Sequence, residues 1–349
     1  MTAPVELERA RSLFPAARGY LDSATIGLPP ATAMDELLAA LEEWRRGGAS
    51  APAYDGWVER SRAAFARLVG APASRVAVGA QVSSFAGVVA GSLPAGAEVL
   101  CAEGDFTSVL FPFLVQRERG VRVRVVPLER LADELRPGTS LVAFSAVQSS
   151  DGRVADLDAI VGAAGECGAA TFLDATQACG WLPLEAERFD YLACSAYKWL
   201  LSPRGTCFFA VRPERLERLT PQLAGWYAGE ERWSSLYGEP LRLAGDARRL
   251  DLSPAWLSFV GTAPALELLA GIGADAIREW TVGLAERVRD ALGMERTGSA
   301  IVSVRAPGAA ERLSQAGIRA SVRGDGARIG FHLYNDAHDA EAAVAALAG

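Results

Sequence analysis

Short apolar segments alternate with longer amphipathic ones through the first two-thirds of the chain, and this alternation limits the possible folds more than any other feature. Seven apolar segments are predicted strands, at 75–80, 98–102, 121–126, 141–147, 171–174, 191–195 and 206–211. The 3.6-residue pattern predicts helices at 31–46, 54–68, 82–93 and 157–167. Apolar strands separated by helices pair in parallel and are covered on both faces. The sequence therefore predicts an α/β fold with a mostly parallel seven-stranded sheet sandwiched by helices.

The length and the C-terminal pattern predict a second, smaller domain. A chain of 349 residues exceeds one ordinary hydrophobic core. From residue 254 on, predicted helices at 264–269, 277–292 and 337–347 flank two predicted strands at 300–304 and 327–332, which predicts an α+β unit. We expect an N-terminal segment (1–20) that packs on the small domain, a large domain (21–253) and a small C-terminal domain (254–349). The tract 220–251, rich in Trp, Tyr and Gly, breaks the alternation; a lid, a subunit contact and plain interdomain packing are all compatible with it.

Composition excludes several classes of protein. The net charge of -7 gives no basic patch for a nucleic acid. No apolar run approaches the ~18 residues that a membrane span needs, and residues 1–10 show no secretion signal, so we expect a cytoplasmic protein. Five cysteines without CxxC spacing and only two histidines argue against a metal cluster and favour reduced, mostly buried thiols.

The basic residues are unusually uneven, because 34 of them are arginines and one is a lysine, Lys198. Either cation serves on a surface, but arginine keeps its proton and cannot act as an amine nucleophile. Lys198 lies in an apolar setting, 195–201, rather than in a charged run. Amine chemistry and a structural lysine that extends along apolar surface are both compatible with this placement.

Polar residues at predicted strand ends suggest what that amine does. Asp174 ends the strand 171–174, and Lys198 follows the next strand at what we expect to be the same sheet edge. The turn after Gly79 opens a helix, whose N-terminus favours a phosphate. An amine, a buried carboxylate and a phosphate site together are what pyridoxal 5′-phosphate (PLP) requires. Alone, Asp174 would be read as a helix cap, and the glycine turn as a simple helix start.

The stretch 172–180 (Phe-Leu-Asp-Ala-Thr-Gln-Ala-Cys-Gly), followed by 195–198 (Ser-Ala-Tyr-Lys) and 203–205 (Pro-Arg-Gly), resembles the aminotransferase class V family of fold-type I PLP enzymes. That family includes cysteine desulfurases, kynureninase, isopenicillin-N-epimerase-like proteins and several transaminases. The resemblance extends over nearly the whole chain, from residue 20 to residue 335. The Asp-x-x-Gln…Lys core is its most specific part.

The resemblance implies roles around the cofactor ring. Lys198 would hold PLP as a Schiff base, and Asp174 would pair with the ring nitrogen. Gln177, with Gln148 nearby, would donate to the phenolic oxygen, and Phe106 would stack on the ring.

The resemblance also implies a phosphate site and a dimer. Ala80 and Gln81 would bind the phosphate through their backbone, helped by Ser195 and Tyr197. Family members work as homodimers in which a neighbouring residue reaches the phosphate, and Ser253 stands near that position. A small amino acid is the expected partner, with its α-carboxylate clamped by Arg328.

Departures from the family pattern narrow the expected reaction. Phe106 stands where desulfurases have a histidine, so an imidazole acid or base is missing there. Tyr197 precedes the lysine, as in kynureninase-like members. No cysteine follows Cys207, which argues against a persulfide-forming desulfurase.

These features favour a lyase that performs β- or γ-elimination with C–S or C–C cleavage. The alternatives are a class V aminotransferase and a catalytically inactive PLP-fold scaffold; the intact set of predicted site residues argues against the scaffold. The side chain of the substrate is not encoded in a recognisable pattern. Candidate contacts, each equally readable as packing, are Ser23, Thr25, Tyr54, Trp256 and His332.

Overall fold

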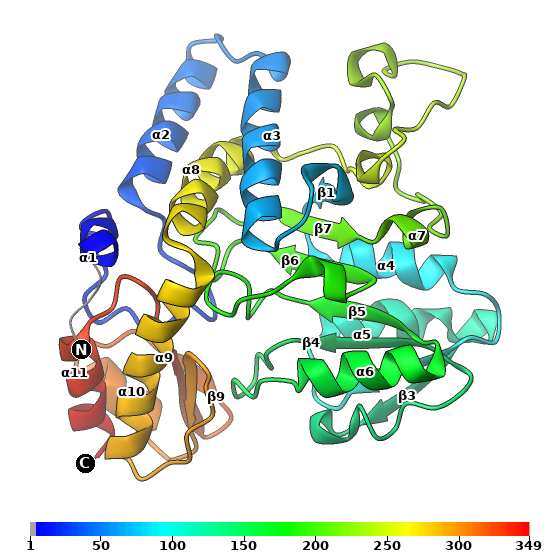
Figure 1. Cartoon of the computed structure of the whole chain (residues 1–349). Coiled ribbons are helices and arrows are strands. Elements are labelled where there is room, and N and C mark those ends of the chain that lie inside the picture. The colour runs from blue at the N-terminus through cyan, green and yellow to red at the C-terminus, as the bar shows by residue number, and fades with distance from the viewer. Residues whose placement is uncertain (1–4, 349) are drawn as a thin grey trace.

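The computed structural model describes residues 5–348 (Figure 1). Seven strands form one sheet in the order β1-β7-β6-β5-β4-β2-β3. Their bounds are Val76–Gly79 (β1), Glu98–Ala102 (β2), Arg122–Val126 (β3), Thr139–Ser145 (β4), Ala170–Asp174 (β5), Tyr191–Ser195 (β6) and Cys207–Val211 (β7). Only β7 runs antiparallel to its neighbours β1 and β6, and the pairs from β6 to β3 are parallel. The expectation of a mostly parallel seven-stranded sheet is confirmed.

Helices cover both faces of this sheet, because successive residues of each strand point to opposite sides. Phe208 stacks on Phe65 at 4.6 Å between ring centroids, whereas its neighbour Phe209 stacks on Phe85 at 4.7 Å. Phe65 belongs to α3 and Phe85 to α4, so the two faces of β7 pack against different helices. The buried side chains accordingly divide into two hydrophobic clusters, one on each side of the sheet.

The helices before and within the sheet region include α1 (Val5–Arg11), α2 (Ala31–Arg45), α3 (Ala51–Leu68), α4 (Val82–Ser92), α5 (Thr107–Leu114), α6 (Leu157–Cys167) and α7 (Pro213–Leu216). The later helices are α8 (Trp256–Ile272), α9 (Ala274–Ala291), α10 (Ala309–Gln315) and α11 (Ala337–Leu347). A three-stranded antiparallel sheet, β8-β10-β9, lies among α9, α10 and α11 (Figure 1). Its strands are Ile301–Val304 (β8), Ser321–Arg323 (β9) and Gly326–Gly330 (β10).

The tract 220–251 contains three short 3-10 helices and packs on α3. The Tyr227 hydroxyl donates to Asp55 at 2.9 Å, and Arg232 donates to Glu59 at 2.6 Å. Beneath them Arg62 and Asp251, both almost fully buried, form a two-armed ion pair of 3.0 and 2.7 Å. The tract is thus fastened to α3 by ion pairs, of which the Arg62–Asp251 pair is buried.

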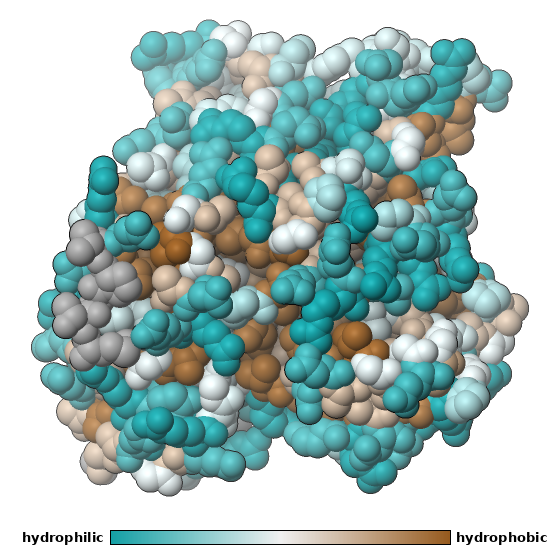
Figure 2. Space-filling model, viewed as in Figure 1, coloured by the Kyte–Doolittle hydropathy of each residue, from teal (hydrophilic) through white to brown (hydrophobic). Residues whose placement is uncertain are grey.

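The surface view gives no single dominant apolar area on the face shown. Figure 2 shows mostly hydrophilic residues there, with smaller hydrophobic areas across the middle of the molecule. Within residues 5–348, no individual helix has the length and apolar character required to cross a membrane; α8 and α9 meet that test only as a pair, bent by 86°.

Candidate active site

A cavity of about 260 Å³ lies where the carboxyl ends of β4, β5 and β6 meet the start of α4. Open α/β sheets bind ligands at such an edge. Eight of the residues predicted from sequence line it: Ala80, Gln81, Phe106, Asp174, Gln177, Ser195, Tyr197 and Lys198. The lining also contains residues to which the sequence analysis assigned no role, namely Val82, Ser108, Ser145, Ser149, Thr176, Arg204 and Gly205.

Asp174 is the last residue of β5 and is almost completely buried. Its Oδ1 accepts a hydrogen bond of 2.8 Å from the backbone N–H of Thr176. Burial raises the pKa of Asp174 to about 6, and the neighbouring Asp105 carboxylate adds to this rise. The floor of the cavity therefore contains a carboxylate whose negative charge is not fully compensated by nearby positive groups.

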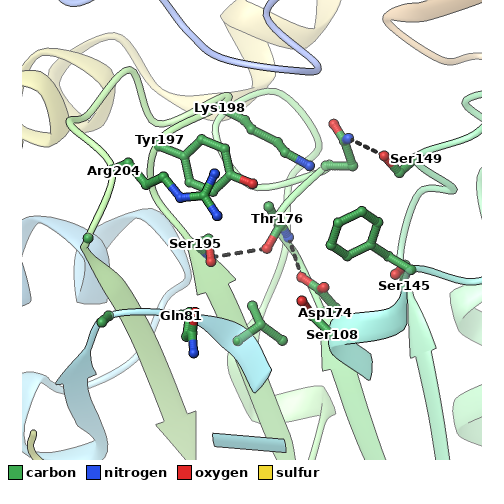
Figure 3. A pocket seen from close by; sticks show the side chains of 15 residues that line it. Gln81, Ser108, Ser145, Ser149, Asp174, Thr176, Ser195, Tyr197, Lys198 and Arg204 are labelled. Carbon is green, nitrogen blue, oxygen red and sulfur yellow. Dashed lines mark hydrogen bonds between the residues drawn. The ribbon is translucent and has the colours of Figure 1, made fainter. Parts of the chain in front are cut away.

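Lys198 extends into the cavity from the loop after β6 (Figure 3). Its side chain is only 5% exposed, and burial lowers the pKa of the amine to about 8, with the charges of Arg328 and Arg323 acting in the same direction against Asp174. The Nζ atom lies 5.2 Å from the ring centroid of Phe106. A buried amine with this pKa is partly neutral near physiological pH, as a nucleophile must be.

The loop that carries Lys198 is held closely by a neighbouring segment. The N–H of Gly27 donates to the carbonyl of Tyr197 at 2.9 Å. A Cβ atom at Gly27 would lie 2.0 Å from the Lys198 carbonyl oxygen, so only glycine fits there. The N–H of Ala196 donates to the Thr206 carbonyl across the same loop, at 3.0 Å. These contacts fix the backbone from which the amine projects.

Phe106 is held in place by Asp105, a buried residue that sequence reasoning missed. The Asp105 carboxylate accepts bonds from the backbone N–H groups of Phe106 (2.6 Å) and Ser145 (2.7 Å), and from the Ser145 hydroxyl. It thereby ties the Phe106 loop to the end of β4. Phe106 itself is 45% exposed, and its ring faces Lys198 across the cavity.

The two glutamines differ in how their amides are used. Gln177 donates from Nε2 to the Ala24 carbonyl and to the Ser149 hydroxyl, both at 2.9 Å, and its Oε1 accepts from Trp199 at 2.8 Å. Gln148 is fully buried outside the cavity lining, and its Nε2 has no hydrogen-bond partner among the described residues. The amide hydrogens of Gln177, predicted from sequence to serve the phenolic oxygen, are thus already engaged.

The end of the cavity at the start of α4, away from Asp174, is suited to an anion. Ala80, Gln81 and Val82 line it at the start of α4, and the Gln81 side chain makes no capping bond, so the first N–H groups of the helix remain available. Ser195 adds a hydroxyl group near this end, whereas the Tyr197 hydroxyl is directed toward Thr176 and Lys198 in the middle of the cavity (Figure 3).

Arg328, on β10, is only 1% exposed and lies next to the cavity rather than in its lining. Its guanidinium donates to the carbonyl and hydroxyl of Ser149 and to the hydroxyls of Thr25 and Ser321. No acidic side chain of residues 5–348 forms an ion pair with it, and its Nε has no partner there. Burial lowers the pKa of Arg328 to about 10. A buried guanidinium without a counter-ion is expected where an anion binds.

The remaining candidate contacts lie outside the cavity. Ser253 is exposed on the segment before α8. Tyr54 and Trp256 stack on each other at 5.5 Å beside a separate surface hollow. Neither Trp226 nor Tyr227 lines the cavity.

His332 belongs to a buried stack of rings. It stacks between Trp199 (5.5 Å) and Tyr334 (5.1 Å), and its Nε2 bonds to the Trp199 carbonyl at 2.9 Å. Burial lowers the pKa of His332 to about 4, so it is neutral at pH 7. The stack joins the loop of Lys198 to the segment after β10.

The residues present fit PLP, as judged from their charges. The buried carboxylate of Asp174 lines the cavity floor and the carboxylate of Asp105 lies close enough to raise its pKa, so the floor favours an additional cationic group such as a protonated ring nitrogen. The other end offers N–H and hydroxyl donors for a phosphate. Phe106 supplies an aromatic face in the cavity lining, close to the Lys198 amine.

Comparisons with known proteins agree with this geometry. The family model described as aminotransferase class V matches residues 20–305. An uncharacterized aminotransferase, YcbU of Bacillus subtilis, is 32% identical over 63% of this chain and 61% of its own length. Isopenicillin N epimerase of Streptomyces clavuligerus is 29% identical over 71% of this chain and 67% of its own length.

Among solved structures, the cystine C-S lyase C-DES superimposes with a TM-score of 0.85 at 21% identity, and the match covers 96% of this chain and 99% of that one. This likeness shows the fold. The chain spans about two-thirds of the length of the two curated relatives named above. Since the family model extends over most of the sequence, the chain belongs to the aminotransferase class V family of PLP-dependent enzymes.

Proposed function

We propose that this protein is a PLP-dependent lyase that acts on a small α-amino acid. The observation that carries the proposal is the buried Arg328 guanidinium, which forms no ion pair with an acidic side chain in residues 5–348 and contacts Ser149 in the cavity wall. An amino acid supplies the missing carboxylate, and the two-armed geometry of a guanidinium fixes its orientation.

The side chains of the protein divide the chemistry among them. Lys198 would hold the cofactor through its amine and, once displaced, take the proton from Cα of the substrate. Asp174 would hold the proton on the ring nitrogen, and Phe106 would cover one ring face. PLP, when bound, supplies a ring that withdraws electrons from Cα. Ser149 and Thr25 would orient Arg328 toward the carboxylate.

The lean toward a lyase rests on Phe106 and Tyr197, which resemble the kynureninase-like branch. A transaminase is the alternative, and the similarity to an aminotransferase, YcbU, favours it. Analysis of the products decides between them. A lyase releases its products from one amino acid without an acceptor, whereas dependence on a keto-acid acceptor would overturn the lyase proposal.

Lys198→Ala tests the assigned amine directly. We expect turnover to be abolished while PLP remains bound noncovalently, since the other contacts persist. Lys198→Arg is the matched variant, because it keeps the positive charge but cannot condense with an aldehyde. Borohydride reduction should fix PLP covalently to the wild type and to neither variant, and mass spectrometry detects the added mass. Covalent PLP on the Lys198→Arg variant, or normal turnover in the Lys198→Ala variant, would refute the role of Lys198.

We also propose that the protein works as a homodimer in the cytoplasm. Four large apolar side chains on one helix, α2, are exposed: Met34, Leu38, Leu41 and Trp44. An exposed stripe of this kind is typical of an interface. The five cysteines form no disulfide, which suits a reducing compartment. Sedimentation velocity tests the dimer, and Leu38→Glu with Trp44→Glu should dissociate it; a monomeric wild type would contradict it.

A further inference from the structure

One charged residue of the cavity has no role in the function proposed so far. Arg204 lies in the turn between β6 and β7, and it is the one arginine in the cavity lining. Figure 3 shows its guanidinium beneath the Tyr197 ring and above Ser195 and Gln81. It therefore lies at the end where α4 begins, away from Asp174.

Arg204 is partly exposed to solvent at the mouth of the cavity, and the contacts around it favour this position without neutralising its charge. Its guanidinium carbon lies 5.1 Å from the Tyr197 ring centroid, a cation–π arrangement. Its carbonyl accepts a bond of 3.0 Å from the Ser258 hydroxyl, which fixes the turn. The next residue, Gly205, has φ of 108°, a conformation that favours glycine, so the backbone reverses directly after Arg204. No acidic side chain in residues 5–348 forms an ion pair with Arg204.

The charges of the cavity show what this arginine can bind. The only other cation in the lining is Lys198, whose amine is assigned to the aldehyde of the cofactor. A phosphate monoester carries a charge of roughly -1.5 to -2 at pH 7, and transferring it from water into a cavity is costly without an opposite charge. Helix N–H groups and the hydroxyl of Ser195 are donors available there, but they carry no full positive charge.

We propose that Arg204 binds the phosphate group of PLP and supplies most of its counter-charge. The guanidinium and the N-terminus of α4 would enclose the phosphate from two sides, with the Tyr197 ring supporting the guanidinium plane. This inference rests on the proposed function, because it assumes that PLP occupies the cavity.

Binding of two ligands to the PLP-free protein tests the proposal. Arg204→Gln should weaken PLP binding by about tenfold, the effect of one charge-assisted hydrogen bond of about 1.4 kcal/mol. Its affinity for pyridoxal, which lacks the phosphate, should be unchanged. Arg204→Lys should restore part of the loss, since it keeps the charge without the two-armed geometry. Arg117→Gln, an exposed arginine on η2 (Val115–Arg119), is the matched control and should bind both ligands as the wild type does.

The outcomes separate the two proposals. Equal loss of PLP and pyridoxal affinity in Arg204→Gln, or no loss of either, would overturn the assignment of Arg204 while leaving the enzyme class intact. Wild-type protein that fails to bind PLP at all would instead overturn the proposed function. Raising the salt concentration should weaken PLP binding to the wild type more than to Arg204→Gln.

Discussion

Replacing Arg328 should stabilise the PLP-free protein or leave its stability unchanged, although the residue is almost fully buried. Burial lowers its pKa to about 10, from a usual value above 12. At 1.36 kcal/mol per pKa unit, the fold disfavours the charged guanidinium by roughly 3 kcal/mol. Arg328→Met removes that cost and keeps much of the apolar stem.

The hydrogen bonds of Arg328 offset part of this gain. Its hydroxyl partners can bond one another, and those of Thr25 and Ser321 already lie 2.5 Å apart. The Ser149 carbonyl would lose a donor, at a cost of about 1–3 kcal/mol. We therefore expect Arg328→Met to change the free energy of unfolding by roughly 0 to 2 kcal/mol in the stabilising direction.

Arg62→Met provides a matched control, because Arg62 is equally buried but paired with Asp251. Removing one partner of a buried ion pair leaves an uncompensated charge and costs roughly 3–5 kcal/mol. Urea unfolding of both PLP-free variants at one protein concentration measures the contrast. Activity should fall by about 10²–10³-fold in Arg328→Met. Similar destabilisation in both variants would refute the view that Arg328 is held in readiness for an anion.

Three further perturbations test the electrostatics of the cavity. The pKa of Asp174 is about 6 in the folded protein and about 3.9 in the unfolded chain, so between these pH values the folded protein binds the proton more readily. The ionised carboxylate therefore destabilises the fold, and this destabilisation is complete above pH 6. Asp174→Asn should thus stabilise the PLP-free protein by up to roughly 3 kcal/mol at pH 7 but not below pH 4. Urea unfolding at the two pH values measures this, and a gain in stability that is the same at both would contradict it. Because the pKa of Lys198 is about 8, the rate at which the protein binds PLP should rise with pH and level off above pH 8. Stopped-flow absorbance measures this rate, and a rate that does not change from pH 6 to 9 would contradict the lowered pKa. Asp105→Asn should weaken PLP binding because it loosens the Phe106 loop, whereas a mobility of Phe106 equal to the wild type by NMR would exclude that cause.

The sequence predicted the large sheet well because buried parallel strands are continuous apolar runs. The bounds of β2 and β6 agree with the prediction to the residue. Short or interrupted elements were missed: α5 contains Pro112, which usually ends a helix, and β9 has three residues, two of them exposed. The predicted helix 264–269 is part of the longer α8, since Pro264 is accommodated within it.

The cavity could be anticipated in part. Asp174 was identified because it ends an apolar strand, and Lys198 because it follows the next strand and is the only lysine in the sequence. Asp105 gave no such signal, because aspartate is common in turns. Arg204 lies in the Pro-Arg-Gly segment at 203–205, but as one of 34 arginines it indicated no role of its own. Which amide hydrogens of Gln177 remain available depends on Ala24 and Ser149, whose proximity only the tertiary fold creates.

The stacked rings of Trp199, His332 and Tyr334 connect the two segments that would bind the ends of an amino-acid ligand. Trp199 adjoins Lys198 in the chain, and His332 follows Arg328 by four residues, so the stack clamps together the two backbones that bear the amine and the guanidinium. If the smaller sheet moved relative to the larger one, the Lys198 amine and the Arg328 guanidinium would therefore move together. If Lys198 and Arg328 bind an amino acid as proposed, the constant distance between them would match the distance from its nitrogen to its carboxylate.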